Sequence, residues 1–284
     1  MIVFLYPDKT QMAKRSVNTL TRAILFVVLL VLAGTTEAEF RTPEEALAAG
    51  EKYTRQIEAA PKDALLYTLR GDASYALDDF HAATKDYSTA IQLDDRQDQA
   101  YFGRGMAFGR MGRIDEAIAD LDVYIQRHPD SSVAYTKRGV RNIWRNNLQE
   151  AERDLAKAVE LDPGNAEAHD DLGVVHAKRN RIQQAARHFS TAIRLDPSYQ
   201  KAYHNLSICF YMTGQYQQAL EILDAGLELD ADSRSSLLMK STILSAMGRT
   251  DEAKTIDEHI EFLPDENWSE LSAIGESANR GSRK

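Results

Sequence analysis

The sequence has few of the residues on which several classes of protein depend, starting with cysteine. Cys209 is the single cysteine among 284 residues, which excludes an internal disulfide. It falls three residues after Leu206 in a helical apolar pattern, so we expect a small buried side chain rather than a reactive thiol. Positive charge is scarce too, because 34 Lys and Arg stand against 43 Asp and Glu. A net charge of −9 without a visible basic stripe argues against nucleic acid as a partner.

The N-terminal apolar run is short. Residues 23–34 form an uncharged stretch of 12 residues, against the ~20 that a stable transmembrane helix needs. Small residues at Thr36 and Ala38 follow it. Basic residues precede it, namely Lys9, Lys14, Arg15 and Arg22. This pattern predicts a secretory signal peptide over residues 1–38, cleaved after Ala38, with Met12 as an alternative start. We therefore expect an exported protein, periplasmic or secreted; the alternative is membrane anchoring by an uncleaved N-terminal segment.

Motifs for catalysis are missing as well. Gly103, Gly105 and Gly109 fail the spacing of a dinucleotide fingerprint, and they lie in a helical pattern with no preceding strand. Among the histidines only His169 and His176 share a helix face, and both stand at packing positions, so we expect structural roles for them. No nucleophile elbow, paired His motif or zinc spacing is present. The sequence therefore predicts no enzyme, no metal site and no cofactor.

What the sequence does have is a repeat of 34 residues. Alanine keeps this interval without a break, at Ala49, Ala83, Ala117, Ala151, Ala185, Ala219 and Ala253. A second register is always small, with Gly71, Gly105, Gly139, Gly173, Ser207 and Ser241. Because small side chains let helices approach closely, both registers predict close helix contacts. Repeats of this kind stack into a solenoid whose surface binds other molecules.

Aligned on this interval, the chain contains six full units, each of which predicts two amphipathic helices joined by a short turn. The units are 64–97, 98–131, 132–165, 166–199, 200–233 and 234–267. The second helices carry one large apolar residue on the stripe of the period alanine, at Tyr87, Leu121, Leu155, Phe189 and Leu223. Residues that tolerate a left-handed helix end stand at the turns, namely Asp78, Gly112, Asn146, Asn180, Gly214 and Gly248.

This pattern resembles the tetratricopeptide repeat family, with an aromatic residue, Leu/Arg-Gly, Ala, an aromatic or leucine, Ala and Asp-Pro in a 34-residue frame. The stretch from Leu172-Gly173 to Asp196-Pro197 matches best, and the resemblance covers about 64–267. It implies an all-α, right-handed α-solenoid of about six repeats. The sixth unit departs from the pattern, and we expect it to be the loosest.

The ends of the array have their own patterns. Residues 39–63 predict an N-terminal capping helix, since Tyr53 and Ile57 continue the register before the first unit. Residues 268–284 predict a C-terminal capping helix, with Trp268, Leu271 and Ile274 at helical spacing, followed by a disordered tail.

The resemblance places the first helices on a concave groove, apolar through its centre, and exposed apolar patches usually mark interaction sites. The residues expected to bind a partner there are Tyr75, Phe102, Met106, Val140, Ile143, Trp144, Val174, Ile208, Tyr211 and Met212. The Lys and Asn with which family members bind peptide carboxylates are mostly replaced, although a weak basic site remains at Lys137, Lys178, Lys201 and Asn205. Two alternatives stay open: these residues touch one another, or the C-terminal tail lies in the groove.

We therefore expect a non-catalytic adaptor of the cell envelope that binds a protein, through an apolar peptide or helical segment, in the concave groove. The alternative is a self-assembling structural protein that forms a homodimer through its C-terminal repeat.

Overall fold

The computed structural model describes residues 40–263; the expected signal peptide and the C-terminal capping helix with its tail lie outside the described residues. Every element in the described range is an α-helix, which confirms the all-α expectation. The helices are α2 (Pro43–Ala59), α3 (Ala64–Ala76), α4 (Phe80–Leu93), α5 (Asp98–Arg110), α6 (Ile114–Arg127), α7 (Ser132–Trp144), α8 (Leu148–Leu161), α9 (Ala166–Lys178), α10 (Ile182–Leu195), α11 (Gln200–Met212), α12 (Tyr216–Leu227), α13 (Arg234–Ala246) and α14 (Thr250–Ile260).

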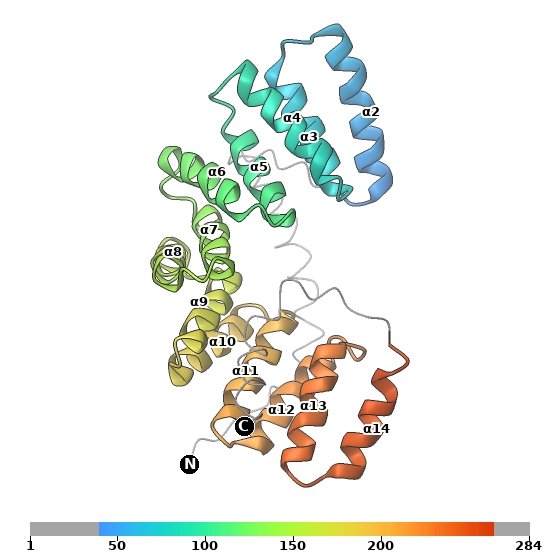
Figure 1. Ribbon diagram of the computed structural model, residues 1–284, viewed down its shortest axis with the longest axis vertical. Coiled ribbons are helices and arrows are strands. Elements are labelled where there is room, and N and C mark those ends of the chain that lie inside the picture. Colours follow the sequence, from blue (N-terminus) through green and yellow to red (C-terminus); the bar gives the residue numbers. More distant parts are fainter. Residues whose placement is uncertain (1–39, 264–284) are drawn as a thin grey trace, which may run out of the picture.

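The helices pair and stack into a curved solenoid (Figure 1). Each pair from α3/α4 to α13/α14 corresponds to one 34-residue interval, and α2 packs against α3 ahead of the first pair. First helices of successive pairs, such as α7 and α9, contact each other, whereas the second helices that the structure describes do not. The first helices therefore lie on the inner, concave side, and α8 is seen on the outer side in Figure 1.

Each pair closes on a residue with positive φ, as the turn residues predict. The φ angles are 56° at Asp78, 62° at Asn146 and 58° at Asn180, and the equivalent glycines have φ of 73° to 76°. In the first pair the backbone N–H of Asp79 donates to the carbonyl of Ser74 at 2.9 Å, the bond of a Schellman motif. The second helix follows at once, and the Asp79 carboxylate caps it by accepting from the N–H of Ala82.

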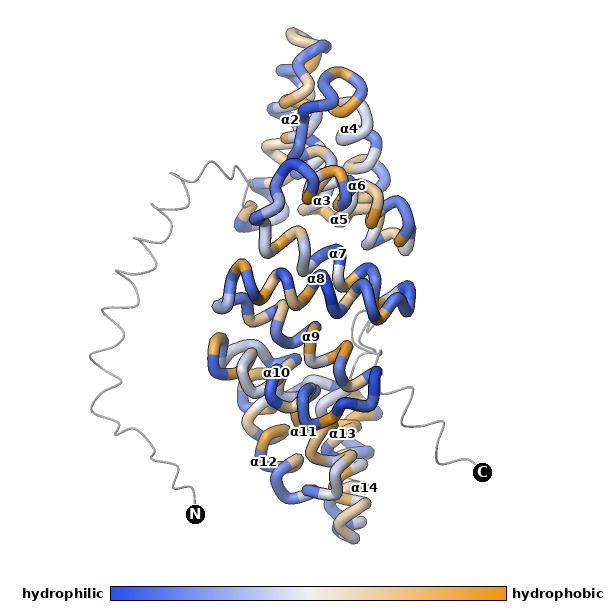
Figure 2. The backbone as a smooth tube through the Cα atoms, turned by 90° about the vertical axis from the view of Figure 1, so that its left-hand side faces the viewer, coloured by the Kyte–Doolittle hydropathy of each residue, from blue (hydrophilic) through white to orange (hydrophobic). Residues whose placement is uncertain are grey.

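The small register brings the two helices of a pair into close contact. A Cβ placed on Gly173 would come within 2.6 Å of the Phe189 ring, and one on Gly71 within 2.7 Å of Tyr87. Both aromatic side chains are fully buried, as are the equivalent Leu121 and Leu155. Truncating such a side chain to alanine costs about 2–5 kcal/mol. Along the outer helices hydrophilic residues intervene between the apolar ones, as Figure 2 shows for α8.

The first three pairs share a second periodic contact, which we call the Arg–Asp pairs. An arginine of the first helix donates two hydrogen bonds to an aspartate of the second: Arg70 to Asp86 (2.7 and 2.7 Å), Arg104 to Asp120 (2.8 and 2.8 Å) and Arg138 to Asp154 (2.9 and 2.6 Å). The third nitrogen of each guanidinium donates to the helix before it, at Thr54, Ser88 and Asp122. Each arginine therefore links three successive helices.

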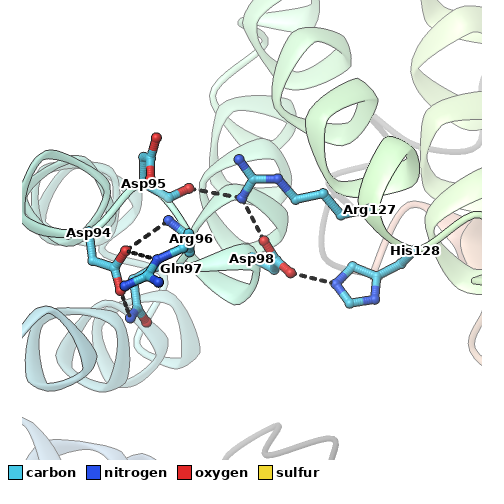
Figure 3. Close-up of polar contacts among 7 residues, drawn as sticks. All are labelled: Asp94, Asp95, Arg96, Gln97, Asp98, Arg127 and His128. Carbon is cyan, nitrogen blue, oxygen red and sulfur yellow. Dashed lines mark hydrogen bonds and ion pairs between the residues drawn. The ribbon is translucent and has the colours of Figure 1, made fainter.

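An ionic cluster holds the second pair to the turn before it (Figure 3). Arg127, at the end of α6, donates to the Asp98 carboxylate at 2.6 Å and to the Asp95 carbonyl at 2.8 Å. His128 lies 2.8 Å from the other carboxylate oxygen of Asp98. Burial opposes ionisation of Asp98, but the hydrogen bonds from Arg127 and His128 outweigh it and lower the pKa of the carboxyl. The start of α5 is thereby fixed against the end of α6.

Candidate functional site

The concave face carries two adjacent cavities. The first, which we call the apolar cavity, has a volume of about 420 Å³ and lies over α3, α5 and the start of α7. Its apolar wall consists of Tyr75, Ala76, Tyr87, Phe102, Met106 and Val133, with Asp72, Gln99, Gly103 and Lys137 beside them. The Tyr87 hydroxyl donates a hydrogen bond to the Asp72 carboxylate at 2.7 Å, so the hydroxyl has its partner within the cavity wall. The cavity has the composition of a pocket for an apolar side chain.

The second cavity, which we call the charged cavity, has a volume of about 180 Å³ and continues the first toward the C-terminus. The two share Tyr75, Met106 and Lys137. Five first helices contribute to it: α3 with Tyr75; α5 with Met106 and Arg110; α7 with Lys137, Val140, Arg141, Ile143 and Trp144; α9 with Glu167, Asp171 and Val174; and α11 with Lys201 and Asn205. Charged side chains therefore line the centre of the concave face.

Two neighbouring carboxyl groups, of Asp170 behind the charged cavity and of Asp171 in its lining, share the Lys201 ammonium. Lys201 Nζ lies 3.5 Å from Asp170 Oδ2 and 3.5 Å from Asp171 Oδ1. Asn205 donates its side-chain amide to the other oxygen of Asp170 at 2.9 Å. Both aspartates are buried, and burial raises the pKa of Asp170 and raises that of Asp171 to about 7. Burial lowers the pKa of Lys201, but the two carboxylates outweigh it and raise that pKa above its ordinary value.

The remaining cations of the charged cavity are paired or stacked. Lys137 donates to both oxygens of Glu167, at 2.6 and 2.8 Å, across the gap between α7 and α9. The Arg141 guanidinium lies 4.4 Å from the centre of the Trp144 ring, within the range of a cation–π contact. It also packs against the backbone of α5, because a Cβ on Gly109 would meet its Nε at 2.1 Å. Glycine at this position therefore makes room for the arginine.

Most of the predicted binding residues come together in these cavities. Tyr75, Phe102 and Met106 line the apolar cavity, and Val140, Ile143, Trp144, Val174, Lys137, Lys201 and Asn205 line the charged one. Lys178, Ile208, Tyr211 and Met212 line neither. Met212 is exposed further along α11, and Tyr211 packs against Tyr216 with ring centres 5.5 Å apart.

The prediction that the apolar residues at the centre of the groove are exposed is wrong for four of them. Phe102, Ile143, Val174 and Ile208 are buried, because successive first helices contact each other and cover the residues between them. The surface left at the centre is mixed: Lys137, Glu167 and Lys201 carry its charge, and Tyr75, Met106, Val140 and Trp144 add apolar surface. What these residues bind stays a prediction.

Four charged residues of the site escape the sequence-based reasoning, namely Arg110, Arg141, Glu167 and Asp171. For Glu167 and Asp171 a signal exists in the repeat alignment. Lys137, Asp171 and Asn205 stand 34 residues apart, and so do Glu167 and Lys201, which places five polar residues on the inner face of three successive units.

His169, His176 and Cys209 are buried, as expected. His169 and His176 are buried, and His188 of α10 lies between them, with ring centres 5.4 and 5.2 Å away. Within residues 40–263 no group of His, Cys, Asp or Glu is arranged to hold a metal ion. Cys209 is buried, and burial raises the pKa of its thiol to about 12, which opposes nucleophilic reactivity.

Comparison with known proteins agrees with this geometry. Two family profiles, both described as tetratricopeptide repeat, match the chain, one over residues 176–241 and the other over 68–132 and 145–199. No curated protein matches the sequence.

Several solved structures share the fold. YrrB, described as a TPR protein with an unusual peptide-binding site, is 23% identical with a TM-score of 0.53, over 66% of this chain and 97% of its own. PilW, described as a widely conserved type IV pilus biogenesis factor, is 18% identical with a TM-score of 0.65, over 76% of this chain and 98% of its own. PilF of Pseudomonas aeruginosa is 16% identical with a TM-score of 0.63, over 78% of this chain and 98% of its own. At these identities the likeness concerns the fold alone.

Proposed function

Since the chain belongs to the tetratricopeptide repeat family, we propose that it is a non-catalytic scaffold that binds another protein through an apolar peptide segment in its concave groove. The apolar cavity carries this proposal. It has room for a large side chain, and its wall is rich in aromatic residues and methionine, which are enriched where proteins bind one another. YrrB, whose description names a peptide-binding site, supports the same use of the fold.

A crosslinking experiment tests the use of the groove. A photoreactive residue at Met106, which borders both cavities, is compared in the native cells with one at Ala156, an exposed residue of the outer helix α8. Capture of one dominant protein from Met106 and not from Ala156 is the expected result. In a matched pair of variants that carry the photoreactive residue at Trp144 instead, Met106→Asp should weaken capture at least about tenfold, because it places a charge in an apolar contact, while Ala156→Asp should not. Equal capture from both positions contradicts the proposal.

The proposed place of action is the cell envelope. Its support is the sequence pattern of residues 1–38, and PilW is described as a pilus biogenesis factor. None of the helices within residues 40–263 is long and apolar enough to cross a membrane. Mass spectrometry of the protein from fractionated cells should find a mature chain that begins at Glu39 outside the cytoplasm. A full-length chain in the membrane fraction would support an anchor instead, and one in the cytoplasm would contradict export.

Self-assembly remains a second candidate, because the last described pair exposes apolar surface. Phe262, just after α14, is 86% exposed, and Leu238 of α13 is 49% exposed. Multi-angle light scattering of the mature protein over a concentration series distinguishes the candidates. A dimer that Phe262→Asp dissociates would support self-assembly, and a monomer at all concentrations would exclude it.

A further inference from the structure

The charged cavity contains one buried acid that the protein itself leaves incompletely paired. Asp171 lines the cavity, is 4% exposed, and its Oδ2 accepts no hydrogen bond from the described part of the chain. An ionised buried carboxylate needs donors for its oxygens, since leaving one unsatisfied costs the full desolvation of that group. The other oxygen, Asp171 Oδ1, lies 3.5 Å from Lys201 Nζ, which is longer than a charged hydrogen bond.

The cations around the cavity already have partners. Lys137 is paired with Glu167, and Lys201 is shared by two aspartates. Arg110 lies 3.7 Å from Asp78 and over the ring of Phe80, and Arg141 lies over Trp144. The group of Asp170, Asp171 and Lys201 thus has two carboxyl groups for one ammonium. Burial raises the pKa of both carboxyl groups, so a second cation beside them would favour their ionisation.

The size and position of the cavity limit what can supply that cation. A volume of about 180 Å³ accommodates one side chain and is smaller than the ~300–1,000 Å³ of pockets for drug-sized ligands. Because it adjoins the apolar cavity through Tyr75, Met106 and Lys137, one extended segment can enter both.

We propose that the charged cavity binds a lysine or arginine side chain of the partner peptide, with Asp171 as the acceptor. The inference rests on the proposed function and specifies the peptide: an apolar residue enters the apolar cavity, and a basic residue a few positions away enters the charged cavity. The incoming ammonium or guanidinium donates to Asp171 and balances the second carboxylate of the group. Val140 and the Trp144 ring flank the methylene stem of the basic side chain.

Defined peptides test this inference on the mature full-length chain. The probes are acetylated, amidated alanine peptides with one phenylalanine and, one to three residues later, lysine, norleucine or glutamate. Trp144 reports binding by fluorescence in a Trp268→Phe background, since the chain has 2 tryptophans. The lysine peptide should bind roughly ten- to a hundredfold tighter than the norleucine peptide, which is the range expected for a charged hydrogen bond.

The variant Asp171→Asn keeps the shape of the side chain and should remove the preference for lysine over norleucine. Asp257→Asn removes one negative charge from the exposed face of α14 and should leave the preference unchanged. If Asp171→Asn fails to fold, the comparison of peptides on the parent chain decides alone.

The outcomes separate the two proposals. Equal affinity for the lysine and norleucine peptides, or tighter binding of the glutamate peptide, overturns the role of Asp171 and leaves groove binding intact. If no peptide of the set changes the Trp144 fluorescence up to its solubility limit, both the cation site and the apolar peptide groove are wrong.

Discussion

The first three helix pairs and the next two solve the same packing problem with different chemistry. The same position of the first helix carries Arg70, Arg104 and Arg138 in the first three pairs, and each arginine is hydrogen-bonded to an aspartate. In the following two pairs this position carries Leu172 and Leu206. The aspartate position likewise changes to His188 and Ile222. The backbone is the same helix pair in both regions. The 34-residue interval therefore does not demand a particular residue at these two positions, which hold an ion pair in the first three pairs and Leu206 with Ile222 in the fifth.

The largest expected difference between the two regions follows from breaking one Arg–Asp pair. Asp120→Ala leaves Arg104 without its partner in an environment where their side chains are 19% and 8% exposed. Removing one member of a buried ion pair costs about 3–5 kcal/mol, because the other charge stays buried. The midpoint of urea unfolding measures the loss. Glu116→Gln breaks the exposed pair with Arg113 and serves as control, with no measurable change expected. Equal effects of the two changes would contradict the buried role of Asp120.

A smaller effect is expected when both partners change together. The double variant Arg104→Leu/Asp120→Ile installs the residues of the fifth unit, Leu206 and Ile222, at the equivalent positions. Replacing a whole buried ion pair by apolar residues is often neutral or stabilising by about 1–4 kcal/mol. Its unfolding midpoint should therefore lie near or above that of the parent chain, far from that of Asp120→Ala. A double variant as unstable as the single one would show that this region requires the hydrogen bond from Arg104 to Ser88.

The smallest expected effect is a loss of stability at low pH. Burial lowers the pKa of His188 and that of His204 to about 4, and it also lowers the pKa of His169 and His176. Because the unfolded chain protonates its histidines near ~6.5, their contribution to stability is complete above that pH and is lost as the pH falls toward 4. Asp171 acts in the opposite direction, since its pKa is raised to about 7.

Hydrogen exchange at pH 6.5 and 4.5, corrected for intrinsic rates, tests this contribution. Protection of α9 to α11 should fall more than that of α3 to α6, and His188→Gln should reduce the difference by removing one contribution. An equal loss of protection in both regions, or no effect of His188→Gln, would refute the assignment.

The sequence predicts the repeat architecture well because its signals are local. The positive φ of Asp78, Asn146 and Asn180 follows from residue type at the helix end, and the burial of Tyr87 and Phe189 follows from their spacing. The groove was less predictable. Val174 and Ile208 stand at the register expected for the groove surface, yet neighbouring helices bury them.

The sequence by itself determined the helix pairs, their turns and their stacking, because each depends on contacts that recur every 34 residues along the chain. Only the tertiary structure decided the character of the concave face. Asp171, Lys201 and Arg141 come from three different helices, and they meet because successive first helices contact one another on the inner side of the curve. Which of these side chains reach the surface depends on how far the neighbouring units cover them. The residue pattern within one unit does not specify that coverage.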